Sequence, residues 1–207
     1  MSLVIDASIV DATTTDAEVV DVAEDVSLRL QKRASSLRFR AMFEAHFDRV
    51  CVALRRFCVP TREIEDAAQQ VFVVAWNKLA SIQPGHERAF LLGTAWNVAS
   101  HSKRTESRRR EVWDVDDRTG EMIDPRSRSD ELVEEKQTRV LLDKVLAAMP
   151  EELRVVLVLH ELEELSRDEI ALALGWRPGT VASRLERARS EFSRLSARAL
   201  QTSGGRS

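Results

Sequence analysis

The stretch "LSRDEIALALGWRPGTVASRLERARSEF" (residues 165–192) decides the fold of this chain, because it reads as two helices joined by a sharp corner. Ser166 followed three residues later by Glu169 is the pattern of a capping box, which begins a helix. Gly175 stands where a left-handed residue ends such a helix. Pro178 suits the first turn of the next helix, where its missing N–H would have no partner anyway. The stretch therefore predicts a helix-turn-helix.

The second helix of this pair has two unlike faces. Steps of four, three, four and three residues predict a buried stripe on one face, made of Val181, Leu185, Ala188, Phe192 and Leu195. The opposite face carries hydroxyl and guanidinium groups near its N-terminal half, from Thr180, Ser183, Arg184 and Arg187. Between Arg177 and Arg198 there are six arginines and only two acidic residues, although the net charge of the chain is −3.

A surface helix needs charge for solubility but does not need one sign of charge. We interpret the polar face as one that enters the major groove of DNA, where arginine binds guanine bidentately and Thr or Ser binds bases or phosphates. Its candidate DNA-binding residues are Arg177, Thr180, Ser183, Arg184 and Arg187. The alternative is an arginine-rich, solvated helix of an ordinary bundle.

Composition and charge distribution support a helical protein that meets nucleic acid. Seven Gly, five Pro and no Tyr in 207 residues favour an all-α fold. Residues 1–27 carry seven acids and no base, residues 97–110 five bases and one acid, and residues 111–135 ten acids against three bases. This segregation indicates basic surfaces that the average charge conceals.

The pattern of periodic segments predicts two small helical domains joined by an acidic linker. We expect an acidic, mostly disordered tail over 1–36, one domain over 37–110, a linker over 111–130, a second domain over 131–200 and a disordered end over 201–207. The second domain should contain helices near 131–148, 151–162, 166–174 and 178–198. In the first, one helix ends before Pro60, Thr61 is placed as the N-cap of the next, and a third runs from about Glu87 to Arg109.

Several classes of protein are disfavoured. The N-terminal stretch has no basic segment and is interrupted by acids, unlike a signal peptide, and the longest apolar run is too short to span a bilayer. Cys51 and Cys58 give no disulfide framework, which suits a reducing cytoplasm. The four histidines are scattered and no Cys-x-x-Cys occurs. We therefore expect no enzyme activity, no metal, no cofactor and no membrane insertion.

At residues 149–192 the chain resembles region 4 of bacterial RNA polymerase sigma factors. The matching pieces are Pro150, Arg154, the Leu-Ser before Glu169-Ile170-Ala171, Leu174-Gly175, Gly179-Thr180-Val181, and Ser183-Arg184-Leu185 with Arg187-Ala188-Arg189. "IEDAAQQVFVVAW" (64–76) and "AFLLGTAWNVA" (89–99) are similar to sigma region 2. Two modules without a long insertion resemble the extracytoplasmic-function group, over roughly residues 37–197.

The resemblance implies a protein that lends promoter specificity to core RNA polymerase. It assigns polymerase binding, at the β′ clamp helices, to Asp66, Gln69 and Gln70, and implies a second contact with the β flap. It assigns −10 recognition and melting to His86, Asn97, Lys103, Arg104 and Arg108, and −35 recognition to the helix-turn-helix. It implies an anti-sigma factor as a further partner, and a cytoplasmic, nucleoid-associated bacterial protein.

Two departures from the family concern the helix that is expected to hold the −10 strand. Gly93 and Trp96 stand where larger or basic residues are usual, and a glycine inside a helix costs about 1 kcal/mol relative to alanine. We interpret Gly93 as loosening that helix. The alternative function is a helix-turn-helix regulator that does not join core polymerase.

Overall fold

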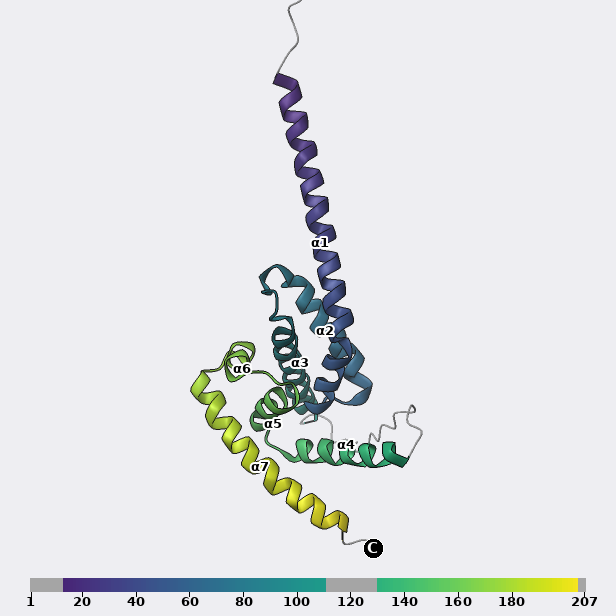
Figure 1. The fold of residues 1–207 in the computed structure, drawn as a ribbon, viewed down its shortest axis with the longest axis vertical. Coiled ribbons are helices and arrows are strands. Elements are labelled where there is room, and N and C mark those ends of the chain that lie inside the picture. Colours follow the sequence, from purple (N-terminus) through teal and green to yellow (C-terminus); the bar gives the residue numbers. More distant parts are fainter. Residues whose placement is uncertain (1–12, 111–129, 205–207) are drawn as a thin grey trace, which may run out of the picture. The chain divides into compact units, whose positions relative to one another are not determined.

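The computed structural model describes the backbone of residues 13–110 and 130–204, and the side chains of residues 27–101 and 138–201. Every element in these ranges is helical, as the all-α prediction requires (Figure 1). The α-helices are α1 Thr13–Arg56, α2 Ile64–Asn77, α3 Glu87–Arg110, α4 Asp130–Ala148, α5 Glu151–Leu157, α6 Arg167–Leu174 and α7 Pro178–Gly204. Short helical turns cover Thr61–Glu63, Leu79–Ser81 and Val158–Leu162. The expected linker falls almost wholly at 111–129, outside the described residues.

Helix α1 begins earlier than the sequence led us to expect. The tail over 1–36 was expected to be mostly disordered, but the helix is continuous from Thr13 to Arg56. Residues 13–36 contain no Gly or Pro to break a helix, and residues 28–34 (LRLQKRA) are all good helix formers. These residues favour helix, so a long α1 needs no turn chemistry before Leu37. At the other end, α7 extends to Gly204, past the expected boundary at residue 200.

The first module, residues 43–110, is built on the apolar faces of α1, α2 and α3. Its core includes Val50, Leu54, Phe57, Val71 and Leu91, all at most 1% exposed. Helices α2 and α3 pack side by side (Figure 1), and Trp96 meets Phe57 edge to face with 5.5 Å between ring centroids. Trp96 is thus a core residue, which explains why no basic residue stands there.

The expected N-cap at Thr61 is wrong. Thr61 opens a 3-10 turn that follows Pro60, and α2 begins at Ile64 with no side chain capping it. Glu63 N donates to Pro60 O at 2.8 Å, so a backbone turn supplies the hydrogen bond that the threonine side chain was expected to provide.

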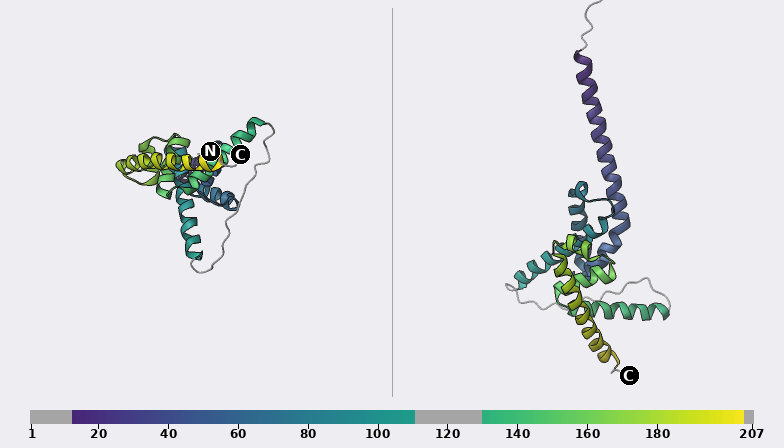
Figure 2. Two further views of the ribbon diagram at one scale, coloured as in Figure 1. Left: turned by 90° about the horizontal axis from the view of Figure 1, so that it is seen from below. Right: turned by 60° about the vertical axis from the view of Figure 1, so that its left-hand side comes forward.

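The second module, residues 130–204, has the predicted four helices. Helix α7 is one long helix with α5 and α6 packed against its N-terminal half (Figure 2). Of the predicted stripe on α7, Val181, Leu185 and Ala188 are buried, while Phe192 and Leu195 are half-buried. The predicted burial is therefore confirmed only where α5 and α6 pack against α7.

Arg154 closes the junction between α4 and α5 from inside the protein. Its buried guanidinium donates to Leu146 O at 2.7 Å and to Met149 O at 2.8 Å. The last carbonyls of a helix have no partner within the helix, and a charged donor satisfies these. This explains in physical terms why an arginine belongs at this position.

Residues 43–207 form one compact unit and residues 1–42 another. Residues 43–110 of the predicted first domain therefore lie in the same unit as the second domain, whereas residues 37–42 fall in the other. In the described part of the chain, no helix is both long enough and apolar enough to cross a membrane.

Candidate nucleic-acid interface

The corner between α6 and α7 is fixed by local hydrogen bonds that match the sequence prediction. Ser166 Oγ accepts from Glu169 N at 3.2 Å, and Glu169 Oε2 accepts from Ser166 N at 2.8 Å, which completes the capping box. Gly175 has φ +66°, and Trp176 N donates across it to Ala171 O at 2.9 Å. Arg177 O then accepts from Thr180 N at 2.9 Å. The direction of α7 is thus set by these local contacts.

The hydrogen bonds from Ser166 lower the pKa of the Glu169 carboxyl. The charged form of the carboxylate is the better acceptor for the two Ser166 donors, so folding favours ionisation. Glu169 also lies in the first turn of α6, where negative charge complements the helix dipole. The cap therefore works best with Glu169 ionised.

The predicted DNA-facing residues lie on the outer side of α7, but their environments differ. Arg177, Ser183 and Arg187 are exposed, whereas Thr180 and Arg184 are half-buried. Ser183 Oγ donates to Thr180 O at 3.1 Å. The exposed pair Arg177 and Arg187 is available to a polyanion as it stands.

Arg184 is held by two residues that the sequence did not single out. Its Nη2 lies 2.7 Å from Glu152 Oε2, and its guanidinium carbon lies 4.1 Å from the centroid of a Trp176 ring. The carboxylate and the aromatic face orient the guanidinium before any ligand arrives. A tryptophan directly after the glycine of the corner was the available signal for this contact.

Other arginines of α7 are paired with carboxylates. Arg189 Nη2 lies 2.7 Å from Glu161 Oε1, and Arg194 Nη2 lies 2.7 Å from Glu191 Oε1. The excess of positive charge that the sequence shows is therefore partly compensated, by Glu161 in the turn that follows α5 and by Glu191 on α7 itself. This compensation concentrates the exposed cationic surface near the start of α7.

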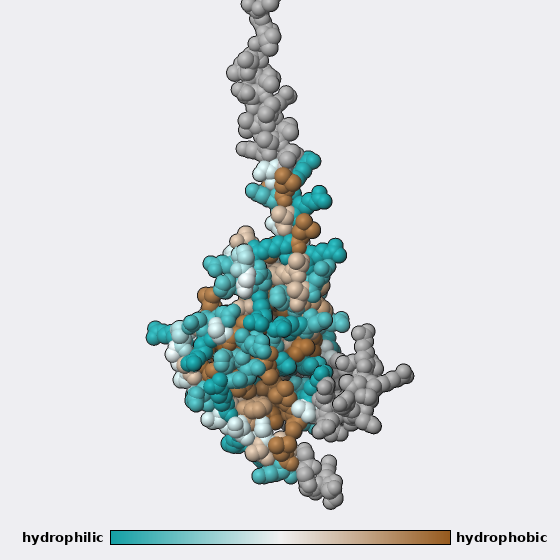
Figure 3. All heavy atoms as spheres, in the orientation of Figure 1, coloured by the Kyte–Doolittle hydropathy of each residue, from teal (hydrophilic) through white to brown (hydrophobic). Residues whose placement is uncertain are grey.

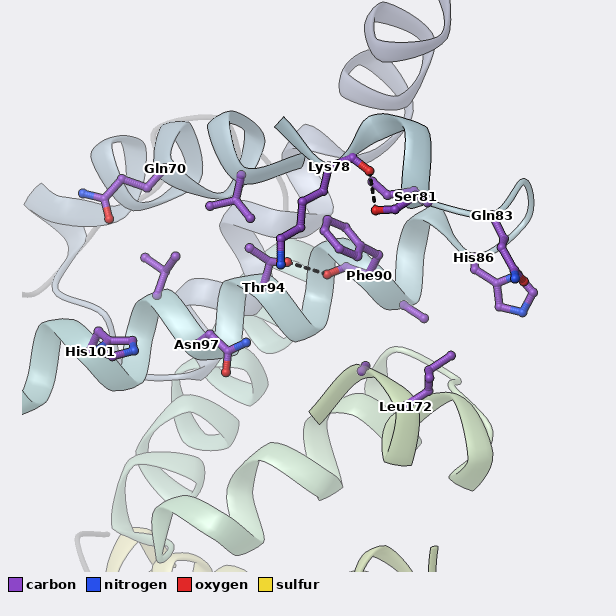
Figure 4. A pocket seen from close by; sticks show the side chains of 15 residues that line it. Gln70, Lys78, Ser81, Gln83, His86, Phe90, Thr94, Asn97, His101 and Leu172 are labelled. Atoms are coloured by element: carbon purple, nitrogen blue, oxygen red, sulfur yellow. Dashed lines mark hydrogen bonds between the residues drawn. The ribbon is translucent and has the colours of Figure 1, made fainter. Parts of the chain in front are cut away.

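A second candidate surface is an open pocket of about 720 Å³ bounded by α2, the loop that follows it, α3 and α6. His86 and Asn97, both predicted to contact DNA, are exposed and line this pocket. Figure 4 shows Asn97 and His101 along α3, Gln70 on α2, and Leu172 projecting from α6. The structure thus brings His86, Asn97 and Gln70 to one pocket, whereas the sequence assigned Gln70 to another surface.

The loop before α3 is shaped by local contacts. Gly85 has φ +88°, a conformation that favours glycine, and its N–H donates to Glu87 Oε2 at 2.6 Å. Within the pocket, Thr94 Oγ donates to Phe90 O at 2.8 Å (Figure 4). Lys78 and Thr94 are further polar lining residues that sequence reasoning missed. From helical periodicity alone, it is ambiguous whether these two positions face a pocket or open solvent.

The remaining predicted residues lie on α2 and α3. Asp66 and Gln69 are exposed on α2, beside the exposed Gln70. Lys103, Arg104 and Arg108 lie on the last turns of α3, whose backbone is helical to Arg110. Their side chains lie outside the described residues.

The architecture defines a protein of two helical modules, one of which carries a helix-turn-helix. Residues 42–109 match the family described as Sigma-70 region 2, and residues 139–192 match Sigma-70, region 4. Together the two matches cover more than half of the chain. The chain therefore belongs to the sigma-70 family of RNA polymerase sigma factors, in its extracytoplasmic-function group.

Curated relatives are similar over most of the chain. The ECF RNA polymerase sigma-E factor of Escherichia coli is 27% identical over 177 residues, which cover 81% of this chain and 91% of that protein. The ECF RNA polymerase sigma factor SigE of Mycolicibacterium smegmatis is 29% identical over 148 residues, 71% of this chain and 57% of that protein. The match of the first module disfavours a plain helix-turn-helix regulator.

Solved structures share the fold. The sigma factor RpoE of Bartonella quintana, solved in complex with the anti-sigma factor NepR, superposes with a TM-score of 0.64 at 21% identity and covers 76% of this chain and 96% of its own. CnrH, solved with the cytosolic domain of CnrY, gives a TM-score of 0.55 at 24% identity over 79% of this chain and 92% of its own.

Proposed function

We propose that α7 recognises the −35 element of promoters through Arg177, Thr180, Ser183, Arg184 and Arg187. The observation that carries this proposal is the corner at Gly175, after which Arg177, directly before α7, and Arg187, further along α7, are both exposed. First turns of a recognition helix are the part that contacts base edges in the major groove. Glu152 and Trp176 then position Arg184 for the same surface.

The pocket beside α3 is the proposed site for the −10 element. Opening a promoter requires a base to leave the stack and to be held elsewhere, at a cost of a few kcal/mol. His86 and Asn97 supply hydrogen-bonding groups at the pocket wall. Lys103, Arg104 and Arg108, at the end of α3, hold phosphates of the same strand, so binding falls steeply with salt.

The exposed polar face of α2 is the proposed contact with the β′ clamp helices of core polymerase. Asp66 and Gln69 lie on this face, with Gln70 next to them. A second contact, with the β flap, is proposed for the apolar surface where α4 and α7 meet (Figure 3). Val140 of α4 is 45% exposed and Leu200 of α7 is 60% exposed. Exposed apolar side chains gathered in this way mark interaction surfaces.

A protein with these contacts acts in the bacterial cytoplasm, at the nucleoid, and needs no cofactor or chemistry of its own. Of the two proteins that share this fold, RpoE was solved with the anti-sigma factor NepR, and CnrH was solved with the cytosolic domain of CnrY. By analogy we propose an anti-sigma factor as a further partner of this chain.

In vitro transcription tests the proposal as a whole. The purified chain is mixed with core polymerase and genomic DNA, and transcript starts are mapped. We expect starts that depend on the chain and share two upstream elements about 25 base pairs apart. Specific duplex binding without any association with core polymerase would instead identify a regulator of the repressor kind and reject the proposal.

A further inference from the structure

The N-terminal part of α1 exposes two leucines on one face of the helix. Leu30 is 61% exposed and Leu37 is 63% exposed. They are seven residues apart, which is about two helical turns, so they lie on the same face. Ala34 and Ala41 continue this face and are exposed as well, and Figure 3 shows apolar side chains among polar ones on this part of the helix. Residues 30–41 therefore expose an apolar stripe to solvent.

The sequence continues the stripe toward the N-terminus. Val19, Ala23, Val26 and Leu30 repeat the same spacing of four, three and four residues, and the backbone of α1 is helical over all of them. Single exposed leucines are ordinary on a protein surface. Apolar residues that recur every three or four positions over about three heptads are instead typical of a helix that pairs with another helix.

Charge is divided along the same stretch of α1. Residues 13–27 carry five acids and no base, and residues 28–40 carry five bases and no acid. Arg29 stands three residues before Lys32 and four before Arg33, spacings at which like charges oppose helix formation. Asp25 and Arg29 are the one acid and base that stand four apart in residues 13–40. A solitary polar helix needs many such pairs, so this stretch depends on a partner.

The division of charge selects the partner and its direction. A second copy of the helix laid antiparallel brings the five acids of each copy alongside the five bases of the other. A parallel pair would set acids beside acids and bases beside bases, which is unfavourable. The antiparallel pair also covers the apolar stripe, and burial of apolar surface is the main favourable contribution to association.

One register satisfies both the stripe and the charges. When residue 28 of each copy lies level with residue 28 of the other, Leu30 is level with Val26 and Leu37 is level with Val19. In that register the basic residues Lys32, Arg38 and Arg40 are level with the acidic residues Glu24, Glu18 and Asp16.

We propose that residues 13–41 of α1 pair antiparallel with the same residues of a second copy, so that the chain forms a dimer. The surface belongs to the compact unit of residues 1–42. The proposal does not rest on the proposed promoter or polymerase contacts, and it can be tested with the purified chain alone.

The first test removes the stripe in the full-length chain. Sedimentation velocity follows the mass of the chain from about 1 to about 200 μM, the range in which a weak interface is measurable. Leu30→Gln combined with Leu37→Gln should weaken dimerisation by about tenfold or more. Leu28→Gln is the matched control, because Leu28 is 50% exposed but lies on the opposite side of the helix from Leu30.

Leu28→Gln should leave the dimer unchanged, and circular dichroism verifies that each variant keeps its helices. A wild-type chain that stays monomeric at every concentration would overturn the proposal. An equal effect of Leu28→Gln and of the double variant would overturn it too, since the stripe would then not be the interface.

The second test exchanges the charges. One variant carries Arg29→Glu, Lys32→Glu and Arg33→Glu, and the other carries Asp21→Lys, Glu24→Lys and Asp25→Lys. Each helix then has mainly one sign of charge, so each variant alone should be monomeric. An equal mixture should associate, because the two helices attract each other in both halves. A mixture that stays monomeric would overturn the pairing by charge.

The same variants distinguish a nucleic acid from a second copy, since a basic helix segment can also bind phosphates. Fluorescence anisotropy with duplex DNA of mixed sequence is the measurement. Suppose that the wild-type chain is monomeric and that Arg29→Glu, Lys32→Glu and Arg33→Glu together abolish its DNA binding. The occupant of this face would then be nucleic acid, and the proposal would be overturned.

The third test measures the direction of the helices. Ser27 and Ser36 are exposed, and each in turn is changed to Cys in a Cys51→Ala, Cys58→Gly background and spin-labelled. In the antiparallel register the two labels at position 27 lie close together. The two labels at position 36 are separated by 16 positions along the axis, or about 24 Å at about 1.5 Å per residue. Electron paramagnetic resonance should show strong coupling at position 27 and a longer distance at position 36. Close labels at both positions would show a parallel pair and would overturn the proposal.

Discussion

Arg184 Nη2 lies 2.7 Å from Glu152 Oε2, and these residues are 32 positions apart in the chain. The pair joins the first turn of α5 to the proposed DNA-reading face of α7. The carboxylate reduces the positive potential of that face while it orients the guanidinium. This relationship separates affinity from specificity, because charge attracts any DNA whereas orientation selects a sequence.

Glu152→Gln should strengthen binding to non-specific duplex DNA and lower the ratio of specific to non-specific affinity. One additional uncompensated positive charge should steepen the dependence of log K on log salt concentration by up to about one. Salt titrations followed by fluorescence anisotropy measure this slope. Glu161→Gln frees Arg189 in the same way, but Arg189 is not one of the proposed DNA-binding residues, so this control should change neither quantity appreciably.

Arg184→Ala and Arg187→Ala should each weaken −35 binding by about 1–3 kcal/mol, since a bidentate arginine contact to guanine is worth about that much. Association with core polymerase should be unaffected. Gel shifts with holoenzyme on a mapped promoter measure the effect. Arg194→Ala is the control, because Arg194 lies further along α7 and pairs with Glu191. No change in either of the first two variants would refute the assignment of this face.

Asp66→Ala combined with Gln69→Ala should affect polymerase binding and not DNA binding, the opposite of the arginine variants of α7. Loss of these exposed groups on α2 should weaken binding to core polymerase, while −35 duplex binding by the free chain stays the same. Competition with a labelled sigma factor for core polymerase is the measurement. Unaltered competition would count decisively against α2 as the docking face.

Ser166→Ala should destabilise the second module by about 1 kcal/mol at neutral pH, because it removes an N-cap. The pKa of Glu169 is lowered by the Ser166 hydrogen bonds, so the stability it contributes is present above its ordinary pKa of 4.5 and is lost as the pH falls through its lowered value. Thermal unfolding at neutral and acidic pH measures this. The difference between wild type and Ser166→Ala should shrink in acid; a constant difference would show that ionisation of Glu169 does not strengthen the cap.

Cys58→Gly should stabilise the first module by roughly 1 kcal/mol, because Cys58 has φ +62° and a non-glycine residue in that region costs about 1–2 kcal/mol. Cys58 N donates to Arg55 O at 2.8 Å, so the turn that ends α1 survives the change. Thermal unfolding gives the difference. Cys51→Gly is the control. Because Cys51 lies within α1, a glycine there should destabilise the first module instead.

The sequence determined the features that depend on neighbours along the chain. The capping box of Ser166, the left-handed Gly175 and Pro178 at the start of α7 act over a few residues, so their chemistry is readable without coordinates. The second module's four helices followed from periodicity, which records the apolar face of each helix. The same rules missed the 3-10 turn at Thr61, where a backbone bond replaced the expected cap.

Tertiary structure decided which faces meet. Arg56 and Glu163 are 107 residues apart, and no local pattern connects them or connects Gly93 to Ala173. A Cβ built on Gly93 would lie 2.5 Å from Ala173 O, so packing against α6, and not a looser α3, accounts for this glycine. A helical stripe shows that a face will be buried but not against what, because many partners bury apolar area equally well and only the close fit of particular side chains distinguishes among them. For that reason the exposed arginines of α7 could be predicted from the sequence, whereas the partner of Arg184 and the place of α6 at the wall of the pocket required the fold.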